Sequence, residues 1–275
     1  PILYFEPIKF KGFGKLYGLD MSKWPKKKIR FKRDNYSNNI WNLGDFILWH
    51  SCKDERYPCW DAPIGRGWPA WNAQDPGIIL HVLGKKVDIC CGGIDNRLMH
   101  HDYNIAIMES YSGEDFCPYW LHGHHLFVNG KKMSKRKNNI LYIEDLLQKG
   151  YTTREIRFFL IYSHYSERMN FTFYKFEKAS KKLNEFSEMI NYIVTINNIQ
   201  NSSSEVSRLI EDLSHEFEEN MSNDLNVKKA FDRVHEITKT LYSLKKKNRI
   251  SDNDSEIIST KIHKIDEVLK VIFTS

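Results

Sequence analysis

The strongest hydrophobic pattern lies in the last third of the chain. Beginning at Phe173, apolar residues recur every three or four positions, which places them along one face of a helix. A polar segment interrupts the pattern, which then resumes and predicts further helices over 205–220, 226–247 and 253–272. Amphipathic helices joined by short polar turns predict an all-α helical bundle over 173–275. The residues on the first helical face are Phe176, Ala179, Leu183, Phe186, Ile190, Ile193 and Ile196.

A different pattern covers the first part of the chain, where short apolar runs are separated by glycines and polar turns. The runs at 2–5 and 46–49 predict strands. Further along, the pattern predicts a buried strand over 87–90, a glycine turn, a helix over 98–110 and a strand over 120–122. This order of strand, turn, helix and strand is typical of an α/β sheet.

The connecting segments carry weaker signals. Residues 57–75 are rich in Trp, Pro and Gly and predict irregular chain, followed by a helix over 77–83. An Asn-Gly pair after a short apolar run predicts a hairpin turn within 126–130. Helices are predicted over 143–149 and 153–162, the second capped by its own first residue, a threonine.

Composition indicates a globular protein, because hydrophobic residues make up 41% of the chain and aromatic residues 13%. No apolar run reaches the roughly eighteen residues of a membrane-spanning helix, so no membrane association is expected. Residues 1–5 do not resemble a signal peptide, and the absence of an initiator Met fits a sequence that starts inside a longer protein. We therefore predict a cytoplasmic location and leave an organellar one open.

The five cysteines predict a protein of a reducing compartment rather than a disulfide scaffold, because their number is odd and their spacing irregular. A zinc site built from Cys52, Cys59, Cys90 and Cys91 is conceivable, but its spacing differs from that of the usual zinc knuckles. The fifth cysteine is Cys117.

The net charge of +6 is concentrated in two basic clusters, at 23–33 and 131–137. Such clusters suit a polyanion, either phosphate or nucleic acid, although a solvated basic surface is the simpler interpretation of one cluster alone. The residues of the first cluster predicted to bind RNA are Lys26, Lys27, Lys28 and Arg30.

The strongest local motif is Lys132-Met133-Ser134-Lys135, which follows the predicted hairpin turn. Two lysines on a mobile loop can meet a triphosphate as negative charge develops on the leaving pyrophosphate. The alternative is a basic surface turn. Class I aminoacyl-tRNA synthetases place their KMSKS loop at the corresponding point, after a strand and before a pair of helices.

A longer part of the chain resembles the cysteinyl-tRNA synthetase family. Gly92-Gly93-Ile94-Asp95, followed by His100-His101-Asp102, is similar to the GGGxD…HHxNE segment of those ligases, and the order and spacing are kept over 45–176. The other similar segments are 61–63, 67–71, 120–123, 157–160, 163–165 and, more loosely, 223–226 with Ala230.

The resemblance implies an α/β fold, the second half of a Rossmann-type catalytic domain, followed by an all-α bundle. It divides the chain into the end of a connective insertion with the basic stretch (1–50), the half catalytic domain (51–125), the KMSKS loop with a stem-contact region (126–172), and a bundle that binds tRNA (173–275).

The resemblance also implies the site. ATP would be the cofactor, and tRNA or another RNA the partner. Lys132 and Lys135 would contact phosphate. Asp95 would bind ribose, with a helix N-cap as the alternative role, and Trp71 would line the amino-acid pocket, with core packing as its alternative. The residues predicted for catalysis are Lys132, Met133, Ser134 and Lys135, and those predicted to bind ATP are Gly92, Gly93, Asp95 and Lys135.

The sequence departs from the family where zinc would be held. The family binds zinc through two Cys, one His and one Glu; here Asp75 stands at the second Cys position and Asn104 at the Glu position, while His100 is kept. Zinc is therefore doubtful, with His100 and Asp75 as weak ligands, and packing or hydrogen bonding is the alternative for His100 and His101. Cys91 replaces a family glycine, and no HIGH-like segment precedes residue 50.

Three functions compete. The first is a cysteine–tRNA ligase, incomplete or impaired in this chain alone, for which a longer chain or a second polypeptide supplies the HIGH-containing half. The second is an inactive synthetase-like protein that binds RNA or acts as a scaffold. The third is a ligase that joins an amino acid to an acceptor other than tRNA.

Overall fold

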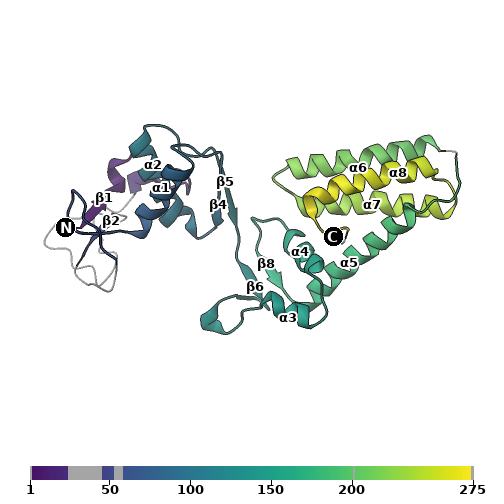
Figure 1. Cartoon of the computed structure of the whole chain (residues 1–275), viewed down its shortest axis with the longest axis horizontal. Coiled ribbons are helices and arrows are strands. Elements are labelled where there is room, and N and C mark those ends of the chain that lie inside the picture. The colour runs from purple at the N-terminus through teal and green to yellow at the C-terminus, as the bar shows by residue number, and fades with distance from the viewer. Residues whose placement is uncertain (1, 24–44, 53–57, 201, 274–275) are drawn as a thin grey trace. The chain divides into compact units, whose positions relative to one another are not determined.

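The computed structural model describes residues 2–23, 45–52, 58–200 and 202–273 (Figure 1). It contains two compact units, residues 1–123 and 124–275, each described here by itself. The basic residues predicted to bind RNA, Lys26, Lys27, Lys28 and Arg30, lie outside the described residues.

The first unit begins with an antiparallel sheet of β1 (Leu3–Phe5), β2 (Phe46–Ser51) and β3 (Gly67–Pro69), in that order. The strands predicted over 2–5 and 46–49 are thereby confirmed. The ring of Phe46 stacks on that of Tyr103, with centroids 3.9 Å apart, so the sheet packs against the helical part of this unit.

The predicted glycine-turn motif is present as a parallel pair of strands, β4 (Ile89–Gly93) and β5 (Tyr119–Gly123), joined through α2 (Asp102–Ser112). One turn of π-helix, Arg97–His101, leads into α2. The strand and helix predictions for this segment are confirmed within a few residues. Parallel strands joined by a crossover helix are the elementary α/β unit.

The prediction for the segment before β4 is confirmed for the end of the helix and wrong for its start. Helix α1 spans Trp71–Val82, whereas the sequence predicted irregular chain to residue 75 and a helix only from Gly77. Pro76 lies inside this helix, although proline lacks the N–H that an interior helical position donates. Pro76 is buried within the helix, and packing of α1 against α2 outweighs the single missing hydrogen bond.

A disulfide joins Cys52 and Cys59, contrary to the expectation that the cysteines are reduced. The backbone N–H of Cys52 donates to the carbonyl of Arg66, and that of Trp60 donates to the carbonyl of Gly67. Both cysteine segments thus flank the same short stretch, which brings the two Cα atoms to 6.1 Å, within disulfide range. This pairing also removes two of the four thiols of the conceivable Cys zinc site.

The second unit begins with a small sheet in the order β7 (Lys131–Lys132), β6 (Leu126–Val128), β8 (Met169–Phe171). The hairpin prediction is confirmed: Asn129 and Gly130 at its tip have φ of 48° and 78°, the left-handed conformation that a two-residue turn requires.

Two helices follow this sheet, α3 (Ile143–Gln148) and α4 (Thr153–Ile161). Both helix predictions are confirmed, but the cap of α4 is Thr152 rather than Thr153. The Thr152 side chain accepts from the N–H of Glu155, and the Glu155 carboxylate accepts from the Thr152 N–H, which makes a complete capping box.

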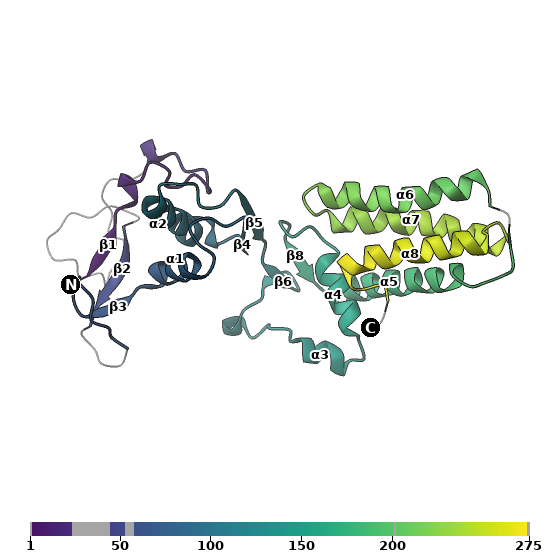
Figure 2. The ribbon, with the colours of Figure 1, turned by 45° about the horizontal axis from the view of Figure 1, so that its top comes forward.

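The predicted bundle is formed by α5 (Phe173–Ile193), α6 (Ser204–Ser222), α7 (Val227–Lys246) and α8 (Asp252–Leu269) (Figure 2). Helix α7 packs against α5 and α6, and α8 packs against α6. Ile196 is 78% exposed because α5 ends before it, so its predicted place on the apolar face is wrong. Residues of the predicted face that are almost fully buried are Phe176, Leu183, Phe186, Ile190 and Ile193.

None of the described helices combines the length and the apolar character that crossing a membrane would require.

Candidate functional site

The KMSK segment forms a turn that is fastened by Asn139. The backbone N–H of Ser134 donates to Asn139 Oδ1 at 2.9 Å, and Asn139 Nδ2 donates to the carbonyl of Lys132 at 3.2 Å. The N–H of Met133 donates to the carbonyl of Leu126, which ties the segment to β6. One amide side chain therefore holds both sides of the turn.

The two motif lysines are presented differently. Lys132 lies on β7, opposite Phe127 of β6, whereas Lys135 begins a 3-10 turn that ends at Asn138, where φ is 49°. Both lysine side chains are exposed. Lys132 Nζ lies 2.9 Å from His125 Nε2, and since an ammonium group only donates, this imidazole nitrogen is the acceptor.

The glycine pair lies at the end of β4, in close contact with the side chains of His101 and Asp95. A Cβ atom at Gly92 would lie 2.4 Å from His101 Cε1, and one at Gly93 would lie 2.7 Å from Asp95 Oδ1. Either contact is far below van der Waals distance, so only glycine fits without displacement. Asp95 is exposed and directly precedes Asn96, where the following turn begins.

A buried histidine pair supports this glycine turn. His101 Nδ1 and His122 Nε2 lie 2.8 Å apart, and the side chains are 4% and 9% exposed. Burial, with smaller effects from His122 and His100, lowers the pKa of His101 to about 4. Burial also lowers the pKa of His122. The hydrogen bond therefore joins two neutral imidazoles at neutral pH, and for His101 the packing alternative is confirmed.

Trp71 and the weak zinc ligands surround the start of α1. The Trp71 side chain is 68% exposed, so its alternative role in core packing is wrong, and its ring centroid lies 6.5 Å from that of His100. His100 Nε2 lies 2.9 Å from Asp75 Oδ2. Asn104 is 3% exposed, and its Oδ1 has no hydrogen-bond partner among the described residues.

These side chains are not a donor set suited to a zinc ion that binds the thiolate of a substrate. His100 and Asp75 are bound to each other, and Asn104 offers a neutral amide oxygen, which is a poor ligand for zinc. Within the described ranges, no three His, Cys, Asp or Glu side chains are grouped closely enough to hold a metal ion.

The predicted site residues fall into two sets. Trp71, Asp75, Gly92–Asp95 and His100 belong to the unit of residues 1–123, and the KMSK turn belongs to the unit of residues 124–275. Asn139 and His125 were not predicted, and the only available signal was that each lies within seven residues of Lys132.

Comparison with solved structures identifies the fold. The Agrobacterium radiobacter K84 agnB2 LeuRS, solved as a ternary complex with tRNA and LeuAMS, has a TM-score of 0.59 at 12% identity, over 80% of this chain and 34% of its own. A putative arginyl tRNA synthetase from Campylobacter jejuni has a TM-score of 0.55 at 14% identity, over 86% of this chain and 57% of its own. At such identities the likeness concerns the fold alone, which is that of the class I synthetases.

Comparison of sequences identifies the family. The model of the class I (C) tRNA synthetase catalytic domain matches residues 2–181, and the chain belongs to this family. Cysteine–tRNA ligase of Protochlamydia amoebophila is 34% identical over 88% of the chain and 51% of its own length. The Chlamydia pneumoniae ligase is 32% identical over 98% of the chain and 57% of its own length. The chain thus spans about half the length of these relatives.

Proposed function

We propose that this chain contributes the phosphate-binding turn and the tRNA-binding bundle of a cysteine–tRNA ligase, which activates its amino acid with ATP and transfers it to tRNA. The observation that carries the proposal is the KMSK turn, whose backbone is fixed by Asn139 while both lysines remain exposed. Membership of the family implies the use of ATP.

In this proposal the lysines act electrostatically. Attack of the amino-acid carboxylate on the α-phosphorus of ATP forms the aminoacyl-adenylate and releases pyrophosphate, on which negative charge develops. Lys132 and Lys135 stabilise that charge, with Met133 and Ser134 as the backbone between them. His125 accepts a hydrogen bond from Lys132 and orients its ammonium group before ATP arrives.

The glycine turn and Trp71 have separate roles. Gly92 and Gly93 make room at the end of β4 for the His101 ring and the Asp95 carboxylate, and Asp95 binds the ribose hydroxyls. The exposed Trp71 ring offers a surface for the amino acid. Because Asp75 and His100 pair with each other, we propose that cysteine is not selected through zinc.

The partner is tRNA, bound by the bundle and by the basic residues Lys26, Lys27, Lys28 and Arg30. Dependence on a second polypeptide that carries a HIGH segment, and a cytoplasmic location, remain predictions from the sequence.

Cysteine-dependent exchange of pyrophosphate into ATP tests the activity. Exchange followed by charging of tRNA supports the proposal, whereas exchange without charging indicates a ligase with another acceptor. No exchange, even after a cysteine–tRNA ligase fragment that carries the HIGH motif is added, contradicts it.

The inactive, RNA-binding protein is the second candidate, and the Asp75–His100 pair at the zinc position favours it. Absence of exchange, together with RNA binding that weakens steeply as salt concentration rises, would support this candidate instead.

A further inference from the structure

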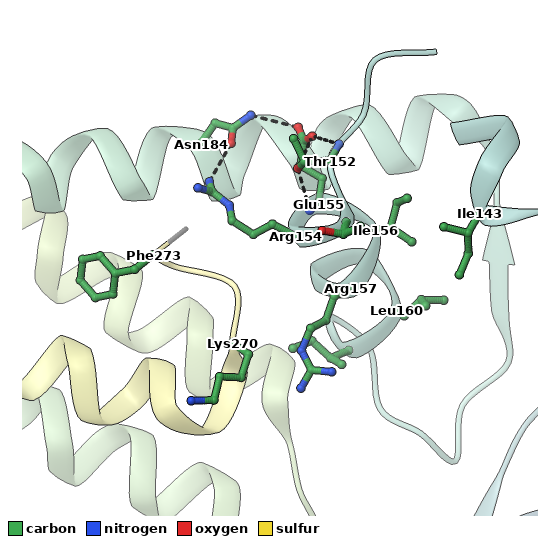
Figure 3. Close-up of a pocket in the computed structure, with 12 residues that line it drawn as sticks. Ile143, Thr152, Arg154, Glu155, Ile156, Arg157, Leu160, Asn184, Lys270 and Phe273 are labelled. Atoms are coloured by element: carbon green, nitrogen blue, oxygen red, sulfur yellow. Dashed lines mark hydrogen bonds between the residues drawn. The ribbon is translucent and has the colours of Figure 1, made fainter. Parts of the chain in front are cut away.

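A pocket of about 620 Å³ lies within the second unit, between the start of α3, the length of α4, the middle of α5 and the segment that follows α8 (Figure 3). A volume of this size is typical of small-molecule sites, which span roughly 300–1,000 Å³. The KMSK residues do not line it, and the proposed function does not use it.

The charges around this pocket are unbalanced. Arg154, Arg157 and Lys270 line it, and among the described residues Glu155 is the one acidic side chain of the lining. The Glu155 carboxylate accepts from the Thr152 N–H and hydroxyl and from the Asn184 amide, so its oxygens are already engaged. The pocket therefore has a surplus of positive charge.

Arg157 and Lys270 have no acidic partner among the residues that the structure describes. Arg157 Nε donates to the carbonyl of Leu269 at 2.7 Å, which fixes the plane of the guanidinium group, and its two terminal nitrogens have no acceptor within the described part of the chain. A guanidinium group held in this way is suited to a bidentate contact with a carboxylate or phosphate.

Arg154 provides an independent indication that the pocket binds a ligand. Its Nη2 donates to Asn184 Oδ1 at 2.9 Å, as Figure 3 shows, and to Ser187 Oγ at 3.1 Å, so two hydrogen bonds hold the side chain in place. Its Nε is buried and has no acceptor among the described residues. A buried donor without an acceptor is costly, and a ligand oxygen would relieve that cost.

Apolar side chains also line the pocket. Ile143 and Leu160 line it and are 53% and 46% exposed, and the ring of Phe273 lines it from the end of the chain that follows α8. Partly exposed side chains of this size can still bury area against a ligand.

We propose that this pocket binds a small organic anion that carries one carboxylate, sulfonate or phosphate group on an apolar body. Arg157 and Lys270 bind the charged group, Arg154 supplies a further donor, and Ile143, Leu160 and Phe273 cover the apolar body. This inference goes beyond the proposed function and does not depend on it.

The test uses 8-anilinonaphthalene-1-sulfonate, which joins one sulfonate to an aromatic body, and its uncharged relative N-phenyl-1-naphthylamine. Fluorescence titration of the folded chain is expected to show one saturable sulfonate site. Arg157→Gln and Lys270→Gln should each weaken it about tenfold or more, because each removes a charged hydrogen bond. Arg208→Gln, at an exposed position on α6 outside the pocket, is the matched control and should leave the affinity unchanged.

Circular dichroism and thermal unfolding of each variant separate lost binding from lost folding, and Lys270→Gln is the safer variant because Lys270 is exposed. Octanoate and octyl phosphate should displace the probe, and the stronger competitor identifies the preferred anionic group. The proposal is overturned if the Arg157→Gln, Lys270→Gln and Arg208→Gln variants bind the sulfonate probe with equal affinity, or if the uncharged probe binds as tightly. It is also overturned if neither octanoate nor octyl phosphate displaces the probe, or if only single-stranded RNA displaces it.

Discussion

The KMSK turn and the side chains around Asp75 match the pattern expected from the family resemblance to different extents. In the turn, both lysines are exposed and the backbone is fixed by Asn139. At α1, the positions that would hold zinc contain Asp75 and His100, which pair with each other, and the buried amide of Asn104.

The difference shows how unequally two kinds of site tolerate change. Phosphate binding needs positive charge on a shaped turn, so Arg136 and Asn138, beyond the four motif residues, can differ from the family pattern without removing the charge. A metal site needs each ligand, because its affinity depends on donor type and number. Two replaced donors, as at Asp75 and Asn104, therefore leave residues that do not form a zinc site of the family type.

The largest expected effect comes from restoring the lost ligands. Asp75→Cys combined with Asn104→Glu should create a site of Cys, His and Glu that binds zinc at about 1 μM or tighter, equivalent to about 8 kcal/mol. The unaltered chain should not retain zinc at that concentration. Titration with a zinc-responsive dye measures both, and His100→Ala in the double variant should abolish binding. A double variant that binds no zinc would mean that these positions do not converge.

The next largest effect is expected on catalysis by the KMSK turn. Lys135→Ala should slow cysteine-dependent ATP–pyrophosphate exchange by about 100-fold or more, because it removes a charge that acts in the transition state. Lys131→Ala, at the neighbouring exposed lysine, is the control and should change the rate by less than about threefold. Equal exchange rates for the Lys135→Ala and Lys131→Ala variants would show that Lys135 takes no part in the reaction.

The histidine beside the zinc position predicts a pH dependence of stability. The pKa of His101 is lowered from 6.5 to about 4 in the folded chain, so the unfolded chain takes up this proton first as the pH falls. Its contribution is fully present above about pH 6.5 and is lost between about pH 6.5 and 4, a change of about 2–3 kcal/mol. Urea unfolding at pH 7.5 and 4.5 should show a smaller pH-dependent loss for His101→Gln than for the unaltered chain. An identical loss in both would contradict the neutral histidine pair.

The smallest effect concerns the backbone at the glycine turn. Gly92→Ala should lower the free energy of unfolding by about 1–3 kcal/mol, because the new methyl group collides with the His101 ring. Gly77→Ala is the matched control: it lies within α1 with open space around the new methyl group and should raise stability by about 0.5–1 kcal/mol. Urea unfolding measures both, and a stabilising Gly92→Ala would show that the close contact with His101 does not constrain this turn.

The sequence predicted the parts of the site that depend on local patterns. The KMSK motif, the Asn-Gly hairpin and the glycine turn could be recognised because each requires particular residue types at adjacent positions. Asn139 and His125 could not be predicted in the same way, because an Asn or His a few residues away carries no sign of what its side chain will contact. The disulfide was missed for the same reason: its two cysteines meet only because their segments flank Arg66 and Gly67.

The sequence by itself determined the bundle and the order of strands and helices, because hydrophobic periodicity reports which face of each element is buried. Only the tertiary structure determined the ion-pair partner of Asp75, the surroundings of Trp71 and the pocket beside α4. These depend on which distant side chains meet, as when Arg157 of α4 reaches the carbonyl of Leu269 at the end of α8. Contacts between segments more than a hundred positions apart leave no periodic signal in the chain.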